Sequence, residues 1–274
     1  MTKSVEVVVI SLLRAAERRR LISEEFAGLA QPWSFFDAHT SLANPALKYD
    51  EARIRRAFGR TLSGPELGVW SSHYTVIQRF LDESRNDYLL VFEDDVIFDT
   101  AFPVSAFTAL CEECGIHYIR LFGKHYADAR RLSFFYDRSI IRYKSSPAGT
   151  QSYLVSKEGA RRLVNGCQAV EATVDLAMDA FWKTGLPIYS VFPFPVIERF
   201  SPTSVPMQNG GDLTGAERKV FTVNRARNRL LKILENRKLT AADRQFRQKS
   251  LDFKQINAGD ERPQVLVRAH SRDD

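Results

Sequence analysis

Three consecutive acidic residues, Glu93, Asp94 and Asp95, follow the apolar run 88–92 and carry the side chains best suited to chemistry. The run is rich in β-forming residues, which predicts a strand buried on both faces. Burying unpaired carboxylates is costly, so we expect the acids at the end of this strand, where open α/β sheets bind ligands. Clustered carboxylate oxygens suit Mn²⁺ or Mg²⁺. Taken alone, the triplet is equally consistent with an acidic turn.

The elements that must position these acids follow from apolar periodicity and end signals. The chain begins strand–helix–strand, which favours a right-handed crossover and a parallel sheet. A helix capped by Ser63 leads to the strand before Glu93, whereas residues 40–64 look irregular. We predict strands over 5–10, 33–36, 118–122, 150–155 and 188–191, antiparallel strands over 133–143, and helices over 15–29, 66–81, 106–114, 156–163 and 176–183.

Composition limits the class of protein. The 274 residues can bury a large core, and no stretch of about eighteen apolar residues is present to span a membrane. The first ten residues resemble a buried strand more than a secretory signal, so we expect a cytoplasmic protein. The three cysteines, Cys111, Cys114 and Cys167, are expected to be reduced thiols because their odd number does not suit a disulfide scaffold.

Positive charge is concentrated at the end of the chain. Residues 1–214 contain 24 basic and 25 acidic side chains, whereas residues 215–274 contain 15 basic and 8 acidic ones. This contrast divides the chain into a catalytic domain, 1–214, and a basic helical extension with a polar tail, 215–274. Leucine and isoleucine alternate with arginine and lysine in the extension, as in helices that bind anionic membranes. A helix packed on the domain with a solvated basic face is the alternative.

Five segments occur in an order that resembles glycosyltransferase family 25. The segment 62–73 (LSGPELGVWSSH) resembles a family pattern ending in Ser-His, although Pro65 is inserted and Val69 replaces the usual Cys. The other segments are 9–19, with Ser11 in place of Asn, the acidic triplet, 149–160 and 173–179, with Thr173 in place of Pro. The resemblance as a whole covers roughly residues 5 to 201. The chain is therefore similar to bacterial lipopolysaccharide and lipooligosaccharide glycosyltransferases.

The resemblance implies an α/β fold of the GT-A type: a mixed, mostly parallel sheet flanked by helices, followed by the basic helical extension. It also implies an inverting transfer of a hexose, galactose from UDP-galactose, to a saccharide acceptor on a glycolipid, with Mn²⁺ or Mg²⁺ bound. Asp95 is the expected direct metal ligand, with Glu93 completing or supporting the metal site. Asp94 is expected to contact the ribose or the donor sugar.

Further donor-binding residues follow from the same resemblance. His73 is expected to bind a phosphate oxygen or the metal, and the alternative is a buried structural histidine. Arg14 and Arg19 are candidates for the pyrophosphate, since guanidinium groups match phosphate oxygens, whereas Arg18 and Arg20 are expected to be solvated. Asp37 could recognise the nucleotide base. Gln151 could contact donor or acceptor hydroxyls.

Asp175 is the expected catalytic base, which would take the proton of the attacking acceptor hydroxyl. Its alternative role is to cap the helix that follows. Asp179, four residues later, is the second candidate base because the two would share a helix face.

Two rival functions fit the same residues. A metal-dependent phosphohydrolase or nucleotidyltransferase could use the same acidic cluster, with Asp175 and Asp179 holding a second metal. The second rival is a non-enzymatic adaptor that binds a membrane or nucleic acid through its basic extension. It would give the acidic triplet no role, and the sequence contains no nucleic-acid recognition motif. For a glycolipid acceptor we expect a cytoplasmic protein, peripheral at the inner face of the inner membrane.

Overall fold

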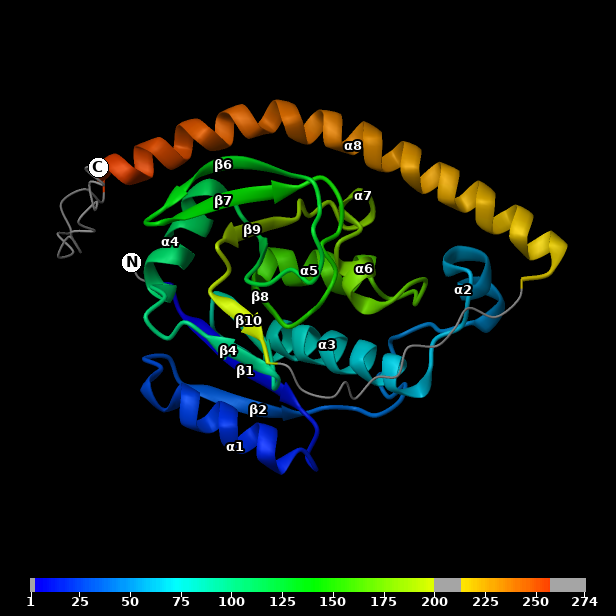
Figure 1. Ribbon diagram of the computed structural model, residues 1–274, viewed down its shortest axis with the longest axis horizontal. Coiled ribbons are helices and arrows are strands. Elements are labelled where there is room, and N and C mark those ends of the chain that lie inside the picture. Colours follow the sequence, from blue (N-terminus) through cyan, green and yellow to red (C-terminus); the bar gives the residue numbers. More distant parts are fainter. Residues whose placement is uncertain (1–2, 200–212, 257–274) are drawn as a thin grey trace, which may run out of the picture.

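The computed structural model describes residues 3–199 and 213–256, which form an α/β fold around one large sheet (Figure 1). The sheet has eight strands in the order β2-β1-β3-β8-β5-β9-β7-β6. The strands are β1 (Val5–Ser11), β2 (Trp33–Asp37), β3 (Tyr88–Glu93), β5 (Tyr118–Arg120), β6 (Ala129–Phe135), β7 (Arg138–Tyr143), β8 (Ser152–Ser156) and β9 (Tyr189–Phe192). A separate two-stranded ribbon pairs β4 (Val96–Phe98) with β10 (Val196–Glu198).

The sheet is mixed, as predicted, and most of its strands share one direction. β1 runs parallel to β2 and β3, and β5 runs parallel to β9. β8 is antiparallel to both β3 and β5, and β7 is antiparallel to both β6 and β9. Only β7 and β8 therefore oppose the other six strands. The opening β1–α1–β2 unit is the parallel strand–helix–strand arrangement that the sequence predicts.

Helices cover both faces of the sheet. They are α1 (Ala16–Glu25), α2 (Glu51–Phe58), α3 (Gly64–Asp82), α4 (Val104–Cys114), α5 (Lys157–Gly166), α6 (Val174–Met178), α7 (Phe181–Thr184) and α8 (Gly215–Ile256), with a 3₁₀ turn at Phe26–Gly28. Ser63 and Glu66 form a capping box at the start of α3, so the predicted cap is confirmed. The predicted helix 176–183 is wrong in its bounds, because the chain turns at Asp179 and forms the two short helices α6 and α7.

The helix α2 lies in the region that the sequence led us to expect as irregular. Asp50 caps it by accepting a hydrogen bond from the Arg53 amide at 2.6 Å, and Gly59 ends it with a φ of 94°. Only Ile54 of this helix is buried. So narrow an apolar face leaves almost no periodic signal, although both end signals are present in the sequence.

Alternate residues of the central strands face opposite sides of the sheet, so the sheet separates two hydrophobic cores. Val7 and Val9 of β1 face one core, with Phe26 and residues of α4. Val8 and Ile10 face the other core, with α3 and α5. All of 88–92 is buried, which confirms the predicted strand buried on both faces.

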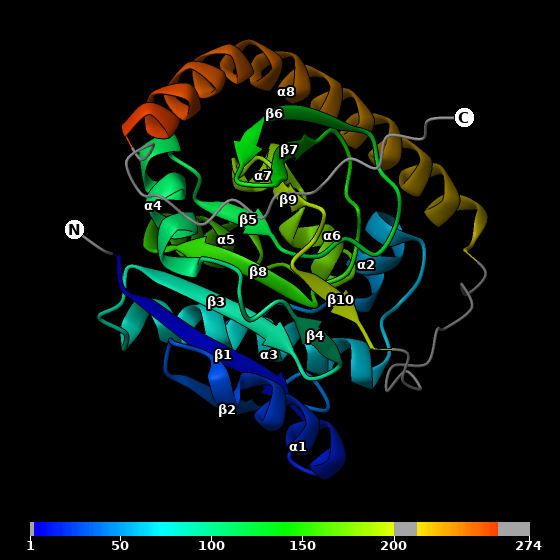
Figure 2. The same ribbon diagram turned by 60° about the vertical axis from the view of Figure 1, so that its left-hand side comes forward.

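The basic extension forms one helix, α8, which follows the outside of the sheet along β6. Both views place α8 across the molecule from α1 and β2 (Figures 1 and 2). The buried Arg142 of β7 donates to both carboxylate oxygens of Asp243 in α8, at 2.8 and 3.0 Å. Nearer the start of α8, Glu217 forms an ion pair with Arg55 of α2 at 2.9 Å. The predicted loop 203–215 falls largely outside the described residues, so the domain boundary at 214 stays a prediction.

Candidate active site

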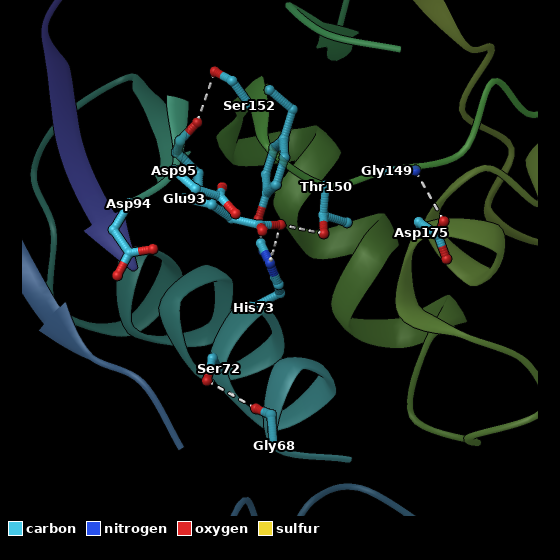
Figure 3. Close-up of polar contacts among 12 residues, drawn as sticks. Gly68, Ser72, His73, Glu93, Asp94, Asp95, Gly149, Thr150, Ser152 and Asp175 are labelled. Atoms are coloured by element: carbon cyan, nitrogen blue, oxygen red, sulfur yellow. Dashed lines mark hydrogen bonds and ion pairs between the residues drawn. The ribbon is translucent and has the colours of Figure 1, made fainter. Parts of the chain in front are cut away.

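The acidic triplet lies at the carboxyl end of β3, as predicted, and its three side chains point in different directions (Figure 3). Glu93 points toward α3 and the start of β8. Its Oε1 accepts a hydrogen bond from the Thr150 hydroxyl at 2.5 Å and lies 3.4 Å from Nε2 of His73. Burial opposes ionisation of Glu93, but the contacts with His73 and Thr150 outweigh it and lower the pKa of this carboxyl. Glu93 is therefore ionised, and Thr150 and His73 fix the position of its carboxylate.

His73 lies beneath Glu93. Its side chain is 1% exposed, and Nδ1 shares a hydrogen bond with the hydroxyl of Tyr153 at 3.2 Å. So deeply buried a ring can orient Glu93 but does not line an open surface where it could contact a nucleotide. Its burial therefore favours the structural alternative, a supporting role, while a direct contact of His73 with phosphate or metal stays a prediction. Thr150 and Tyr153 were not singled out as site residues, although both lie within the motif segment 149–160.

Asp94 points to the other side of the strand and is held by α1 and β1. Its Oδ2 accepts from the Ser11 hydroxyl at 2.6 Å, and its Oδ1 accepts from Arg18 at 3.1 Å. Arg18 also lies 3.6 Å from Oδ2 of Asp95. The expectation that Arg18 is solvated is wrong, because the first turn of α1 brings it to the acids. Arg20 is exposed and pairs with acids of its own helix, as expected.

The remaining candidates from the start of the chain lie at the ends of β1 and β2. Arg19 donates to Oδ1 of Asp37 at 2.5 Å and to the carbonyl of Ser11 at 2.9 Å. Ser11 and Asp37 are neighbours in the parallel register, which explains how one guanidinium reaches both. Arg14 is exposed in the turn after β1. Arg19 and Asp37 thus form an ion pair with each other, whereas Arg14 is the candidate whose side chain is exposed to solvent.

Asp95 is the acid of the triplet whose ionised form a bound cation would stabilise most. Its Oδ1 is buried and has no hydrogen-bond partner within the described part of the chain. Burial, followed by the nearby Glu93 carboxylate, raises the pKa of Asp95 to about 7 against the partial opposition of Arg18. Asp94 and Glu198 of β10 raise it further. Sequence reasoning missed Glu198, because only the pairing of β10 with β4 brings it near the triplet.

The donor set fits a divalent cation only with help from a substrate. Across residues 3–199 and 213–256, no group of three or more His, Cys, Asp or Glu side chains is arranged to hold a metal by itself. Carboxylates at the mouth of a site commonly bind Mg²⁺ together with substrate phosphates. The unpartnered oxygen of Asp95 and the charged Glu93 are the residues that would hold such an ion. The amide oxygen of Gln151 is also buried without a partner among the described residues.

The two candidate bases occupy different environments. Asp175 is half-buried in the first turn of α6, where Oδ2 accepts from the amide of Gly149 at 2.9 Å and Oδ1 accepts from the amide of Leu176. Its charge is close enough to Glu93 to oppose ionisation of that residue. Asp179 is 1% exposed and forms an ion pair with Arg120 at 2.6 Å. Asp175 therefore faces the site, whereas Asp179 lies behind it and has no exposed surface from which to act as a base.

The motif 62–73 shapes the edge of the site through α3. The Ser72 hydroxyl accepts from the amide of His39 at 2.9 Å and donates to the carbonyl of Gly68 at 2.8 Å. A Cβ at Gly68 would lie 2.5 Å from the carbonyl oxygen of His39, so the small residue permits this close approach. Gly68 and Ser72 together hold the loop that continues from Asp37.

The carboxylate cluster lies at the carboxyl end of β3, which is the place where open α/β sheets bind ligands. The pattern of the family described as glycosyltransferase family 25 (LPS biosynthesis protein) matches residues 4–178. The chain belongs to this glycosyltransferase family.

Individual relatives agree with this assignment. The chain is 30% identical over 209 residues to the lacto-N-neotetraose biosynthesis glycosyltransferase LgtE of Neisseria gonorrhoeae, covering 68% of this chain and 71% of the relative. It is 28% identical over 213 residues to LgtB of Neisseria meningitidis serogroup B, covering 68% and 72%. It is 26% identical over 174 residues to a putative glycosyltransferase of Haemophilus influenzae, covering 63% and 60%. The chain is thus a glycosyltransferase related to enzymes of lipooligosaccharide biosynthesis.

Proposed function

We propose that this protein transfers galactose from UDP-galactose, with inversion, to a saccharide of a lipooligosaccharide acceptor and depends on Mn²⁺ or Mg²⁺. The observation that carries the proposal is the position of Asp175 across from the acidic triplet at the end of β3. The names of LgtE and LgtB, which refer to lacto-N-neotetraose biosynthesis, support an oligosaccharide acceptor. Galactose and inversion rest on the family resemblance of the sequence motifs.

Each residue has a distinct part in this proposal. Asp95, with Glu93 behind it, would hold the cation, which would neutralise the charge that develops on the leaving diphosphate. Arg18 and Ser11 fix Asp94 beside the donor. Asp175 takes the proton from the acceptor hydroxyl as that hydroxyl attacks the anomeric carbon. Because a single displacement inverts the anomeric centre, one base on the acceptor side is sufficient.

Release of UDP from UDP-sugars in the presence of Mn²⁺ tests the proposal. We expect saturable turnover with UDP-galactose, and a loss of at least about 100-fold in Asp95→Asn, which keeps the size of the side chain and removes its charge. Asp137→Asn is the matched control, since the side chain of Asp137 is 85% exposed in the β6–β7 turn, and we expect it to retain full activity. Turnover that survives in Asp95→Asn would remove the metal assignment. Hydrolysis of simple phosphoesters without preference for a sugar would favour the phosphohydrolase or nucleotidyltransferase class.

We also propose that the exposed face of α8 rests on an anionic membrane surface, at the cytoplasmic face of the inner membrane. No helix in the described ranges is long and apolar enough to cross a bilayer. Val223 and Leu230 are 65% and 57% exposed on this helix. Between residues 218 and 244 there are nine Lys or Arg and two acids, of which Asp243 is buried against Arg142. The other acid, Glu235, pairs with Lys238 at 3.0 Å, so the stretch keeps a clear excess of positive charge. Exposed apolar residues among an excess of positive charge suit a surface of anionic lipid headgroups.

Co-sedimentation of the full chain with vesicles tests this surface. We expect binding to phosphatidylglycerol vesicles and not to phosphatidylcholine vesicles, and binding about tenfold weaker when Val223 and Leu230 are both replaced by Ser. Ala226→Ser, at another exposed position of α8, is the control and should bind like the wild type. Equal binding by the double variant would reject a membrane role for this helix.

A further inference from the structure

A cluster of charged and hydroxyl groups lies buried behind the proposed base. Arg120 of β5 and Asp179, both 1% exposed, form an ion pair at 2.6 Å. The hydroxyls of Tyr118 and Ser146 also donate to Asp179, at 3.2 and 2.6 Å. Every oxygen of this carboxylate is therefore occupied. A buried pair of this kind stabilises a fold no better than apolar residues of the same volume, so its contribution must be sought in what it positions.

The cluster holds the loop 146–149. Arg120 donates from its second terminal nitrogen to the carbonyl of Ala148 at 2.9 Å. The Ser146 hydroxyl accepts from the amide of Ala148 at 3.0 Å while it donates to Asp179. Both backbone groups of Ala148 are thus tied to the cluster. Ala148 has a φ of 57°, a conformation that a residue with a Cβ adopts only when its surroundings enforce it.

The loop in turn holds the proposed base. Gly149 follows with a φ of 81°, and its amide donates to Oδ2 of Asp175 at 2.9 Å. A Cβ at Gly149 would lie 2.3 Å from Oε1 of Gln151, so this end of the loop packs closely against Gln151. A continuous series of hydrogen bonds therefore runs from Asp179 through Arg120, Ser146 and Ala148 to Gly149 and the carboxylate of Asp175.

We propose that Arg120, Asp179 and Ser146 are positioning residues, which fix the loop 146–149 so that the Gly149 amide orients the carboxylate of Asp175 toward the acceptor hydroxyl. The inference rests on the proposed function, in which Asp175 is the base. Catalytic groups must be held close to their productive geometry, and small displacements of such a group lower the rate steeply. Asp179 then acts through Asp175 and does not itself accept the proton.

Ser146→Ala tests the proposal because Ser146 is only half-buried, so its loss should leave the fold intact, yet it removes two hydrogen bonds of the cluster. We expect kcat for galactosyl transfer to fall roughly tenfold. The KM for UDP-galactose should change little. The unfolding midpoint in urea should fall, because the buried Asp179 carboxylate loses one hydrogen bond, but the variant should stay fully folded under the assay conditions. Ser145→Ala, the same substitution one residue earlier, is the control and should leave kcat, KM and the midpoint unchanged. A wild-type kcat in Ser146→Ala, or a loss of kcat that comes only from unfolding under the assay conditions, would overturn the proposal.

A double-mutant cycle separates this inference from the proposed function. Asp175→Asn should lower kcat at least about 100-fold with little change in the KM for the donor, and adding Ser146→Ala to it should lower the residual rate no further. If Asp175→Asn keeps the wild-type rate, the assignment of the base fails. If Asp175→Asn shows this loss but Ser146→Ala lowers the residual rate as much as it lowers the wild-type rate, the base stands and the positioning role fails. Gly149→Ala, which displaces the amide itself, should lower kcat at least as far as Ser146→Ala.

Discussion

Replacing Gly68 by Ala should destabilise the protein, although alanine is the better helix former. In an exposed helix interior this exchange stabilises by about 1 kcal/mol. Here the added Cβ would lie 2.5 Å from the carbonyl oxygen of His39, 2.7 Å from the carbonyl carbon of Thr40 and 2.9 Å from the amide of Ser41. All three are backbone atoms and cannot rotate away. Overpacking of this kind costs about 1–3 kcal/mol.

A second loss follows from moving the same loop. The hydrogen bond from the His39 amide to Ser72 would lengthen, at a cost of about 1 kcal/mol. This loss roughly cancels the gain in helix propensity, so the net free energy of unfolding should fall by about 1–3 kcal/mol. Urea unfolding measures the change directly.

Gly64→Ala is the matched control in the same helix. A Cβ at Gly64 would lie 3.9 Å from the carbonyl oxygen of Thr40, an ordinary contact. Its unfolding free energy should stay within about 0.5 kcal/mol of the wild type. A Gly68→Ala variant as stable as the wild type, or more stable, would show that α3 and the loop after β2 do not approach as closely as described, and the reasoning would fail.

Three further predictions concern charge. Arg142→Met leaves the carboxylate of Asp243 buried without its main partner, so the free energy of unfolding measured in urea should fall by about 3–5 kcal/mol. A fall of less than about 1 kcal/mol would contradict the buried ion pair. The hydrogen bond with Arg55 lowers the pKa of Glu217 to about 2. The contribution of this pair to holding the first turns of α8 on α2 should therefore be complete above pH 4.5 and decrease as the pH falls toward 2. Amide hydrogen exchange of residues 215–225 should show this, and Glu217→Gln should abolish the dependence. Burial, followed by the nearby Glu93 carboxylate, raises the pKa of Asp95 to about 7. Ionisation of Asp95 therefore destabilises the metal-free fold as the pH rises from 3.8 through 7. The variant Asp95→Asn should have a higher melting temperature than the wild type at pH 8 and the same melting temperature at pH 4.

Local rules predicted the strand that carries the site and the helix beside it. The apolar run 88–92 and the acids after it could only be placed one way, because the apolar residues need burial and the carboxylates need an edge. Ser63 and Glu66 likewise define the start of α3 through their own side chains. Such signals lie within a few residues and need no knowledge of the rest of the fold.

The parts that the sequence did not predict depend on contacts between distant segments. Arg18 and Arg20 lie in the same run of three arginines, yet only the packing of α1 beside β4 and the turn before it brings Arg18 to Asp94. The spacing of Asp179 from Asp175 predicts a second candidate base, but the ion pair with Arg120 of β5 holds Asp179 in the interior. Glu198 comes near Asp95 only through the β4–β10 ribbon. No local pattern contains these long-range pairings.

The shape of α8 has a mechanical consequence if its outer face rests on a membrane, as proposed above. Forty-two residues at about 1.5 Å per residue give a helix of about 63 Å along its axis, and this axis arches over the sheet with its convex side outward (Figure 1). An arch of this kind meets a plane at its middle and not along its whole length, so the protein can rock end over end about that contact. Because Arg142 and Arg55 fix α8 to the sheet and to α2, the same rocking would raise and lower the catalytic centre above the plane. The enzyme would then reach acceptors over a range of heights.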